Sequence, residues 1–338
     1  MSSHTYLIKN ALLINEGAEL VTDVLIKNGR IEKIDKSQRA PSEQHETINA
    51  EGQYLFPGII DNHVHFREPG LTSKGDLLTE SKAALAGGIT STMEMPNTKP
   101  PVTDFERLQE KFDLASQKCL TNYSFYLGAS NDNLETLKRA NDLDICGVKV
   151  FMGSSTGNML VDDKTMLEKV LSNVKKLIAV HAEDEEVIKD NLYTIKRIYG
   201  EDPPIEAHPK IRDERACYDA SNLIINLARK YCSRLHMLHV TTQEELGLFD
   251  TAPLEEKHIT AEACVNHLYF DNRDYEKLGN KIKCFPSIKA PRHKKGLLQG
   301  LKEGKLDIIA SDHAPHLLNE KDTDYLNSPG GIPMIQHS

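Results

Sequence analysis

Two histidines one residue apart, His63 and His65, are the first residues here whose type and spacing suggest chemistry. They end an apolar, β-branched run that begins at Ile59, and a Pro69-Gly70 turn signal follows. In an extended strand, residues i and i+2 point to the same side. The two imidazoles therefore converge where the strand stops, as half of a site for a divalent transition metal. Spacing alone leaves open a pair of ordinary strand histidines.

Further candidate ligands end three other apolar runs: His181, His239 and Asp312. Each of these residues by itself is more often a helix cap, a turn residue or a hydrogen-bonded core group. A hydrophobic strand that ends in His or Asp four separate times is, however, difficult to explain by chance. Together the four strand ends predict a buried site for divalent metal ions.

Lys149 lies inside an otherwise apolar run, Gly147-Val148-Lys149-Val150-Phe151-Met152. Burial disfavours the ammonium form and lowers the pKa of a lysine. The neutral amine can take up carbon dioxide as a carbamate, whose two oxygens and single negative charge suit two cations ~3.5–4 Å apart. From spacing alone, a lysine that extends to solvent or pairs with a buried carboxylate is the more common case.

Such a centre would support hydrolysis, or its reverse, at an amide-like carbonyl. A water shared by two divalent cations ionises near neutral pH, and a cation can also polarise a carbonyl. Asp312, beside the metals, could take the proton from the attacking oxygen and later give it to the leaving nitrogen. We therefore assign Asp312 a catalytic acid–base role as well as a ligand role.

Alternating strand and helix signals from Ile59 onward would position these residues. Eight apolar runs suit buried strands, at 59–65, 89–95, 123–127, 147–152, 177–181, 235–240, 259–265 and 306–311. Helix-like stretches include 74–86, 105–118, 164–174, 212–231 and 292–301. This α/β alternation predicts a parallel sheet, and eight repeats predict a closed (β/α)₈ TIM-type barrel, whose active site lies at the C-terminal strand ends. A doubly wound open sheet is the alternative, but no Gly-x-Gly-x-x-Gly follows the first strand.

The N-terminal residues have a different pattern. Short strand signals occur at 6–14, 24–27, 31–34 and 46–48, and Asn28-Gly29 is a two-residue hairpin signal. We expect residues 1–55 to form a small β-sandwich domain and residues 56–338 to form the metal-dependent barrel. Because only 27 residues follow Ser311, we also expect the C-terminal part of the barrel to be missing.

Length, charge and cysteine usage restrict the class of protein. The 338 residues carry a net charge of −9 without a basic block, which argues against nucleic acid and anionic membranes as partners. No apolar run approaches the ~20 residues of a membrane span, and the polar N-terminus is not a signal peptide. Six scattered cysteines without a Cys-x-x-Cys pair favour reduced thiols. We predict a soluble cytoplasmic protein that acts on a small molecule.

Three motifs resemble those of the amidohydrolase superfamily, and within it the barrel-type dihydroorotases that carry a carboxylated lysine. They are Asp61-Asn62-His63-Val64-His65-Phe66-Arg67-Glu68-Pro69-Gly70, Met95-Pro96-Asn97-Thr98 and Ser311-Asp312-His313-Ala314-Pro315-His316. The resemblance implies two zinc ions per chain, bridged by carboxylated Lys149. It implies that the other ligands are His63, His65 and Asp312 on the first ion, and His181 and His239 on the second.

The reaction implied by the resemblance is the reversible closure of N-carbamoyl-L-aspartate to L-dihydroorotate and water, in de novo pyrimidine biosynthesis. The substrate is anionic and needs a cationic partner, for which Arg67 offers a bidentate guanidinium. Asn97 would add amide hydrogen bonds and His316 a further donor. A homodimer is compatible with the resemblance.

Two other kinds of function stay open. A hydantoinase, dihydropyrimidinase or allantoinase would act on a ring amide without a ring carboxylate, so that Arg67 would have no partner. A non-catalytic, dihydroorotase-like assembly protein would be expected to have lost metal ligands, and this sequence retains them all.

Overall fold

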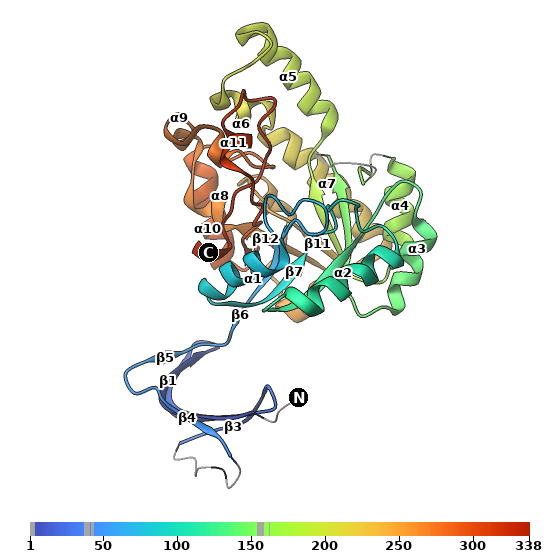
Figure 1. The fold of residues 1–338 in the computed structure, drawn as a ribbon. Coiled ribbons are helices and arrows are strands. Elements are labelled where there is room, and N and C mark those ends of the chain that lie inside the picture. The colour runs from blue at the N-terminus through green and yellow to red at the C-terminus, as the bar shows by residue number, and fades with distance from the viewer. Residues whose placement is uncertain (1–3, 37–40, 42–43, 154–158, 162) are drawn as a thin grey trace. The chain divides into compact units, whose positions relative to one another are not determined.

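A computed structural model describes residues 4–36, 41, 44–153, 159–161 and 163–338 of the chain. The chain folds into two compact units, Met1–Ile59 and Ile60–Ser338 (Figure 1). The six cysteines are free. In the described ranges, the helices are too short or too polar for any of them to cross a membrane.

The first unit is built on one five-stranded sheet. Its strands are β1 (Thr5–Asn15), β2 (Ala18–Lys27), β3 (Arg30–Asp35), β4 (Glu46–Asn49) and β5 (Tyr54–Leu55). Strands β1 to β3 pair antiparallel, whereas β4 and β5 both run parallel to β1. Asn28 and Gly29, with φ of 52° and 75°, form the left-handed turn of the predicted β2–β3 hairpin. The described strands form this one sheet rather than the two of the expected sandwich.

The second unit is organised around an eight-stranded sheet in which consecutive strands are neighbours. Its strands are β6 (Ile59–Val64), β7 (Ile89–Glu94), β8 (Asn122–Gly128), β9 (Gly147–Met152), β10 (Ile178–Ala182), β11 (Leu235–Met237), β12 (Ile259–Cys264) and β13 (Ile308–Ala310). A parallel bridge between Val64 and His313 joins the first strand to the segment after the last. The predicted α/β class, a TIM-type barrel with a separate N-terminal β part, is confirmed.

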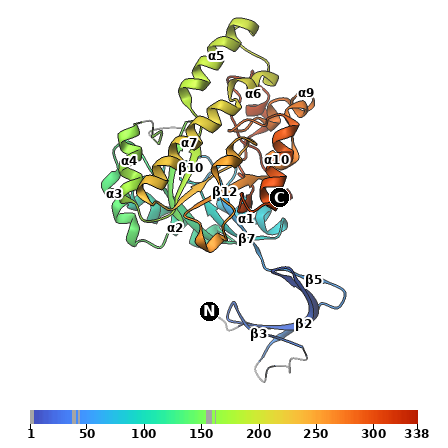
Figure 2. The ribbon, with the colours of Figure 1, turned by 180° about the vertical axis from the view of Figure 1, so that it is seen from behind.

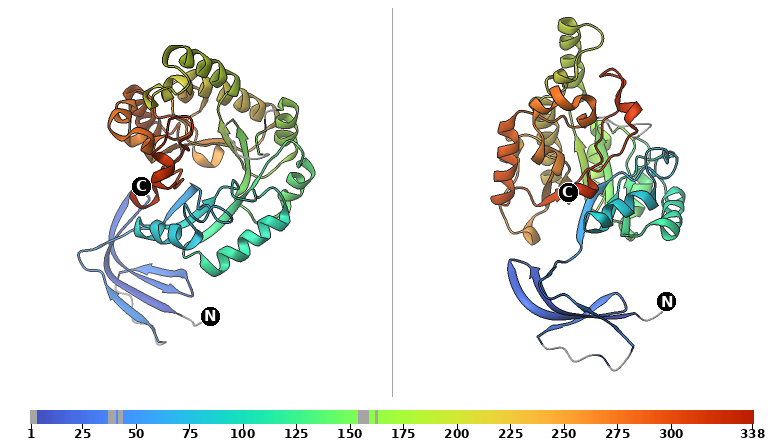
Figure 3. Two further views of the ribbon diagram at one scale, coloured as in Figure 1. Left: turned by 45° about the horizontal axis from the view of Figure 1, so that its top comes forward. Right: turned by 60° about the vertical axis from the view of Figure 1, so that its left-hand side comes forward.

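Helices surround these strands, as the left view of Figure 3 shows. They are α1 (Leu77–Ala86), α2 (Phe105–Lys118), α3 (Leu134–Arg139), α4 (Lys164–Asn173), α5 (Glu185–Tyr199), α6 (His208–Ile211), α7 (Glu214–Tyr231), α8 (Val265–Tyr269), α9 (Tyr275–Leu278), α10 (Pro291–Lys302) and α11 (Leu318–Lys321). The predicted helices correspond to α1, α2, α4, α7 and α10, the last two of which are clear from behind (Figure 2). Helix α7 begins after Asp213, whose carboxylate accepts a hydrogen bond from the Ala216 amide.

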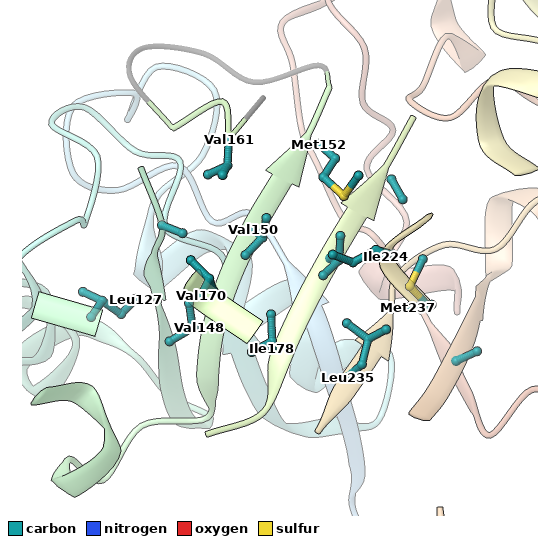
Figure 4. Packing of buried hydrophobic residues seen from close by; sticks show 14 of the residues in the cluster. Leu127, Val148, Val150, Met152, Val161, Val170, Ile178, Ile224, Leu235 and Met237 are labelled. Atoms are coloured by element: carbon teal, nitrogen blue, oxygen red, sulfur yellow. The ribbon is translucent and has the colours of Figure 1, made fainter. Parts of the chain in front are cut away.

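The hydrophobic core of the barrel lies between the strands and the outer helices. Val148 and Val150 of β9 are buried together with Val170 of α4 and Ile224 of α7 (Figure 4). Successive residues of a strand point to opposite faces of the sheet. Lys149, between the two valines, therefore faces the barrel interior. The packing of the valines against the outer helices thus directs the Lys149 side chain inward.

Truncation of Ile224 tests this core. Ile224 is 1% exposed, so Ile224→Ala should lower the free energy of unfolding by about 2–5 kcal/mol, through lost burial and the cavity left behind. The matched control is Ile198→Ala on α5, where the side chain is 66% exposed and the change should stay within about 0.5 kcal/mol. Urea denaturation followed by circular dichroism measures both. Equal losses in the two variants would contradict the packing described.

Candidate metal centre

Three predicted ligands converge where β6 and β13 end. The Nε2 atoms of His63 and His65 each lie 3.2 Å from Oδ1 of Asp312. All three side chains are buried, and their ligand atoms lie within 4.8 Å of one another. Two imidazoles and a carboxylate in this arrangement match the donors that zinc and related divalent metals take in proteins.

Hydrogen bonds on the far side of each ring aim these imidazoles. Nδ1 of His63 lies 2.6 Å from Oε1 of Glu262, and Nδ1 of His65 lies 2.7 Å from Oδ1 of Asn97. Because both oxygens are acceptors, each Nδ1 carries a proton, and Nε2 is the nitrogen that a bound metal ion would take on each ring. Burial lowers the pKa of His65 to about 4, which keeps this ring neutral. The donor set therefore fits a divalent metal ion.

His181 and His239 form a second pair of donors at the ends of β10 and β11. Nδ1 of His181 lies 2.8 Å from Nε2 of His239, and the His239 ring centroid lies 5.4 Å from that of His63. Nε2 of His181 lies 3.0 Å from Glu183, which also forms an ion pair with Arg212. Burial lowers the pKa of both histidines, and neutral imidazole is the form that binds metals.

Lys149 lies in the same cavity, of about 370 Å³, as the five other predicted ligands. Its side chain is buried, and its Nζ stands 4.4 Å from the centre of the Phe151 ring. Burial lowers the pKa of Lys149 to about 7. Within the described ranges it forms no ion pair, so neither solvent nor a buried carboxylate accounts for this lysine.

Three of the seven non-glycine residues with positive φ in the described ranges are predicted site residues. Arg67, His239 and Asp312 have φ of 71°, 39° and 47°, in the left-handed region that side chains with a Cβ avoid. Such conformations cost on the order of 1–3 kcal/mol each and persist where surrounding contacts enforce them. Their coincidence at three predicted site residues is independent structural support for a functional centre here.

Glu262 is the site residue that sequence reasoning missed. It is fully buried on β12, and its carboxylate accepts hydrogen bonds from five groups. The donors are Asn62 Nδ2 at 2.7 Å, His63 Nδ1 at 2.6 Å, His236 Nε2 at 3.0 Å, the His239 amide at 3.1 Å and Cys264 Sγ at 3.5 Å. The available signal was a carboxylate inside an apolar strand, the same anomaly that drew attention to Lys149. Glu262 thus supports one member of each histidine pair.

The cavity has a cationic end, lined by Arg67, Lys74 and His316. Nζ of Lys74 lies 3.1 Å from Nδ1 of His316, and Nε2 of the same ring lies 3.0 Å from both Nη2 of Arg67 and the Gly330 carbonyl. Burial, Arg67 and Lys74 lower the pKa of His316 to about 3, so the ring is neutral. Asn97 also lines the cavity, but its amide oxygen is already occupied by His65.

The barrel holds a cluster of buried donors that could bind metal ions, and comparison with known proteins gives the family. Residues 54–335 match the sequence profile of the amidohydrolase family. A dihydroorotase of Methanosarcina acetivorans is 34% identical, over 97% of this chain and 71% of its own length. An allantoinase of Deinococcus radiodurans is 29% identical, over 98% of this chain and 74% of its own length.

Among solved structures, an L-hydantoinase from Arthrobacter aurescens superposes with a TM-score of 0.92. It is 26% identical in sequence, and the match covers 98% of this chain and 75% of the hydantoinase. This chain therefore belongs to the amidohydrolase family, and its relatives place it among the cyclic amidohydrolases. The family resemblance read from the three sequence motifs is confirmed.

Glu262→Gln tests the support given to the histidines. An amide keeps the size of the side chain, but its NH₂ cannot accept hydrogen bonds, so the donors on one of the two carboxylate oxygens lose their acceptor. We expect zinc affinity, measured by competition with a chelator, to fall by about 10–100-fold. The matched control is Glu245→Gln, a buried carboxylate that accepts from Ser221 and Thr242 outside the cavity. An unchanged zinc affinity in Glu262→Gln would contradict the role assigned to Glu262.

Proposed function

We propose that this chain is a dihydroorotase, which interconverts N-carbamoyl-L-aspartate and L-dihydroorotate with two zinc ions. The observation that carries the proposal is the cationic end of the cavity beside the metal donors, at Arg67 and Lys74. A ring that bears a carboxylate requires such a partner, whereas a hydantoin or allantoin ring does not. The dihydroorotases of Methanosarcina acetivorans and Methanosarcina mazei, 34% and 33% identical, support the same reaction.

The proposed ligands are His63, His65 and Asp312 for one zinc ion, and His181 and His239 for the other. Carboxylated Lys149 would bridge the two ions, which is supported by its buried amine, its pKa of about 7 and its lack of an ion-pair partner among the described residues. When bound, the ions supply an activated water and polarise the carbonyl.

Asp312 is the proposed acid and base. Burial raises its pKa, but His63 and His65 outweigh this effect and keep the carboxyl ionised. In ring closure the ureido nitrogen forms a bond to the side-chain carboxyl carbon and passes a proton to Asp312. Asp312 returns this proton to the departing carboxyl oxygen, which takes a second proton from solvent and leaves as water as its bond to carbon breaks. In hydrolysis the same carboxyl gives the proton to the ring nitrogen as the C–N bond breaks.

Arg67, Asn97 and His316 are the proposed partners of the substrate. Nε of Arg67 donates to the Pro315 carbonyl at 3.1 Å and Nη2 lies 3.0 Å from Nε2 of His316, which orients the guanidinium and leaves Nη1 for a carboxylate. With its amide oxygen on His65, Asn97 has its NH₂ group left to donate.

A hydantoinase or allantoinase is the second candidate, favoured by the 0.92 TM-score to an L-hydantoinase and by the 29% identity to an allantoinase. A substrate panel separates the candidates. Zinc-loaded protein should turn over dihydroorotate and carbamoyl aspartate, and should act far more slowly on hydantoin, dihydrouracil and allantoin. The reverse order of rates would reject the dihydroorotase proposal. A non-catalytic assembly role is disfavoured, because all six proposed ligands line one cavity.

Arg67→Met tests the carboxylate partner. Loss of a buried, charge-assisted pair costs about 2–5 kcal/mol, so kcat/KM for dihydroorotate should fall at least about 30-fold. Zinc content should stay near that of the parent, because Arg67 is not a proposed ligand. The control is Arg215→Met, which removes the same charge from a side chain that is 74% exposed, and it should leave kcat/KM unchanged. Turnover by Arg67→Met within a few-fold of the parent would refute the role.

Lys149→Ala tests the bridge. The variant should bind less zinc, should lose the ion held by His181 and His239 first, and should lose activity by orders of magnitude. Acetate or propionate added with excess zinc should restore part of the turnover by occupying the vacated space. The control is Lys257→Ala, a buried lysine paired with Asp307 at 2.7 Å outside the cavity, which should lose stability and keep its zinc. Two zinc ions per chain and near-normal rates in Lys149→Ala would rule the carbamate out.

A further inference from the structure

The segment from Asp324 to Gly331, here called the wall segment, follows α11 and ends against the cavity. Pro329, Gly330 and Gly331 line the cavity beside Arg67. In Figure 1 this stretch is the dark red chain beyond α11. Tyr325 ties it to α6, because its hydroxyl lies 2.9 Å from Nδ1 of His208. One side of the cavity is thus formed by the backbone of the wall segment. The position of this side depends on the contacts that hold the segment in place.

Two buried lysines hold the wall segment. Nζ of Lys283 donates to the carbonyls of Tyr325 and Ser328. Nζ of Lys321 donates to the Lys283 carbonyl at 3.0 Å and to the Pro329 carbonyl at 2.8 Å. Lys283 and Lys321 are only 4% and 6% exposed, and neither forms an ion pair with any residue that the structure describes. Both ammonium groups therefore hydrogen-bond to backbone carbonyls.

The wall segment in turn fixes the substrate side of the cavity. The Gly331 amide donates to the Lys283 carbonyl at 2.9 Å, and the Gly330 carbonyl lies 3.0 Å from Nε2 of His316. The segment packs closely against Phe285, because a Cβ on Gly330 would lie 2.8 Å from the Phe285 ring. The two lysines consequently set the place of His316 without touching the cavity.

Positive charge at this end of the cavity exceeds negative charge. Lys283 and Lys321 add to Arg67 and Lys74, and Lys74 pairs with Glu320 at 2.9 Å. Burial and neighbouring cations lower the pKa of Lys321 to about 7 and that of Lys283 to about 8. Like charges crowded in a buried place disfavour their own charged forms, and an anion bound among them relieves that cost.

We propose that Lys283 and Lys321 are positioning residues for the anionic end of the substrate. They hold Pro329 to Gly331 and His316 in place and maintain a positive potential there. The inference rests on the proposed function, because a carboxylate on the ring is what this end of the cavity would bind. In this role the two lysines affect the affinity for the substrate and do not take part in bond formation at the metal centre.

Steady-state kinetics with dihydroorotate test the proposal in zinc-loaded Lys321→Met and Lys283→Met. KM should rise at least about tenfold, as expected when charge near a bound anion is lost, with kcat within about threefold and zinc content unchanged. Lys257→Met, which removes a buried ammonium outside the cavity, should lower the melting temperature and leave KM unchanged. An unchanged KM in both variants, or a fall in kcat alone, would overturn the proposal.

A further variant covers the case in which the lysine variants do not fold. Gly330→Ala pushes the wall segment away from Phe285 and should raise KM in the same way, and an unchanged KM counts against the proposal. If the parent protein does not turn over dihydroorotate, the proposed function fails independently of the lysines. Calorimetry with succinate, a simple dianion, then decides: weaker binding to the variants than to the parent supports the positioning role, and equal or absent binding to both overturns it.

Discussion

The carboxylate of Glu262 is the interaction on which the rest of the site depends. One buried anion accepts hydrogen bonds from the His63 ring and from the His239 backbone, 199 and 23 residues away in sequence. His239 has a left-handed φ of 39°, a conformation that needs an external contact to persist. Glu262 supplies that contact and also fixes the tautomer of His63. Both histidine pairs therefore depend on the Glu262 carboxylate. This buried charge is stabilised by the hydrogen-bond donors that surround it.

The closure of the barrel imposes the second constraint. Asp312 follows β13, and the Val64–His313 bridge brings this segment beside β6. The His65 amide donates to the His313 carbonyl at 2.8 Å, which fixes the register of the two segments at the point where the ligands meet. Asp312 can reach both histidines because this bridge is formed. The same strand thus has two roles: Val148 and Val150 pack on its outer face (Figure 4), and Lys149 lies on its inner face.

The residues that could be predicted from sequence are those that follow a local rule. Period-2 alternation and the barrel's strand ends were enough for His63, His65, His181, His239 and Asp312, because each position can be read from a few neighbours. At Glu262 a carboxylate inside an apolar strand was a local signal, but its partners are brought close only by the fold. The same holds for the partners of Lys283 and Lys321, which have no such signal. Local pattern also could not distinguish one sheet from two in the N-terminal unit, where short strands alone do not show how they pair.

Charge, more than shape, separates this cavity's candidate substrates. Dihydroorotases, an allantoinase and an L-hydantoinase all match nearly the whole of this chain, so the shared fold does not choose among them. What can choose is the opposite end of the cavity, where Arg67 has a strained φ of 71° and its Nε bound to the Pro315 carbonyl. A cation held so firmly loses little entropy when a carboxylate binds, but it would cost desolvation against a neutral ring. Discrimination by this means requires that the surrounding backbone not relax, and the buried ammonium groups of Lys283 and Lys321 provide that rigidity.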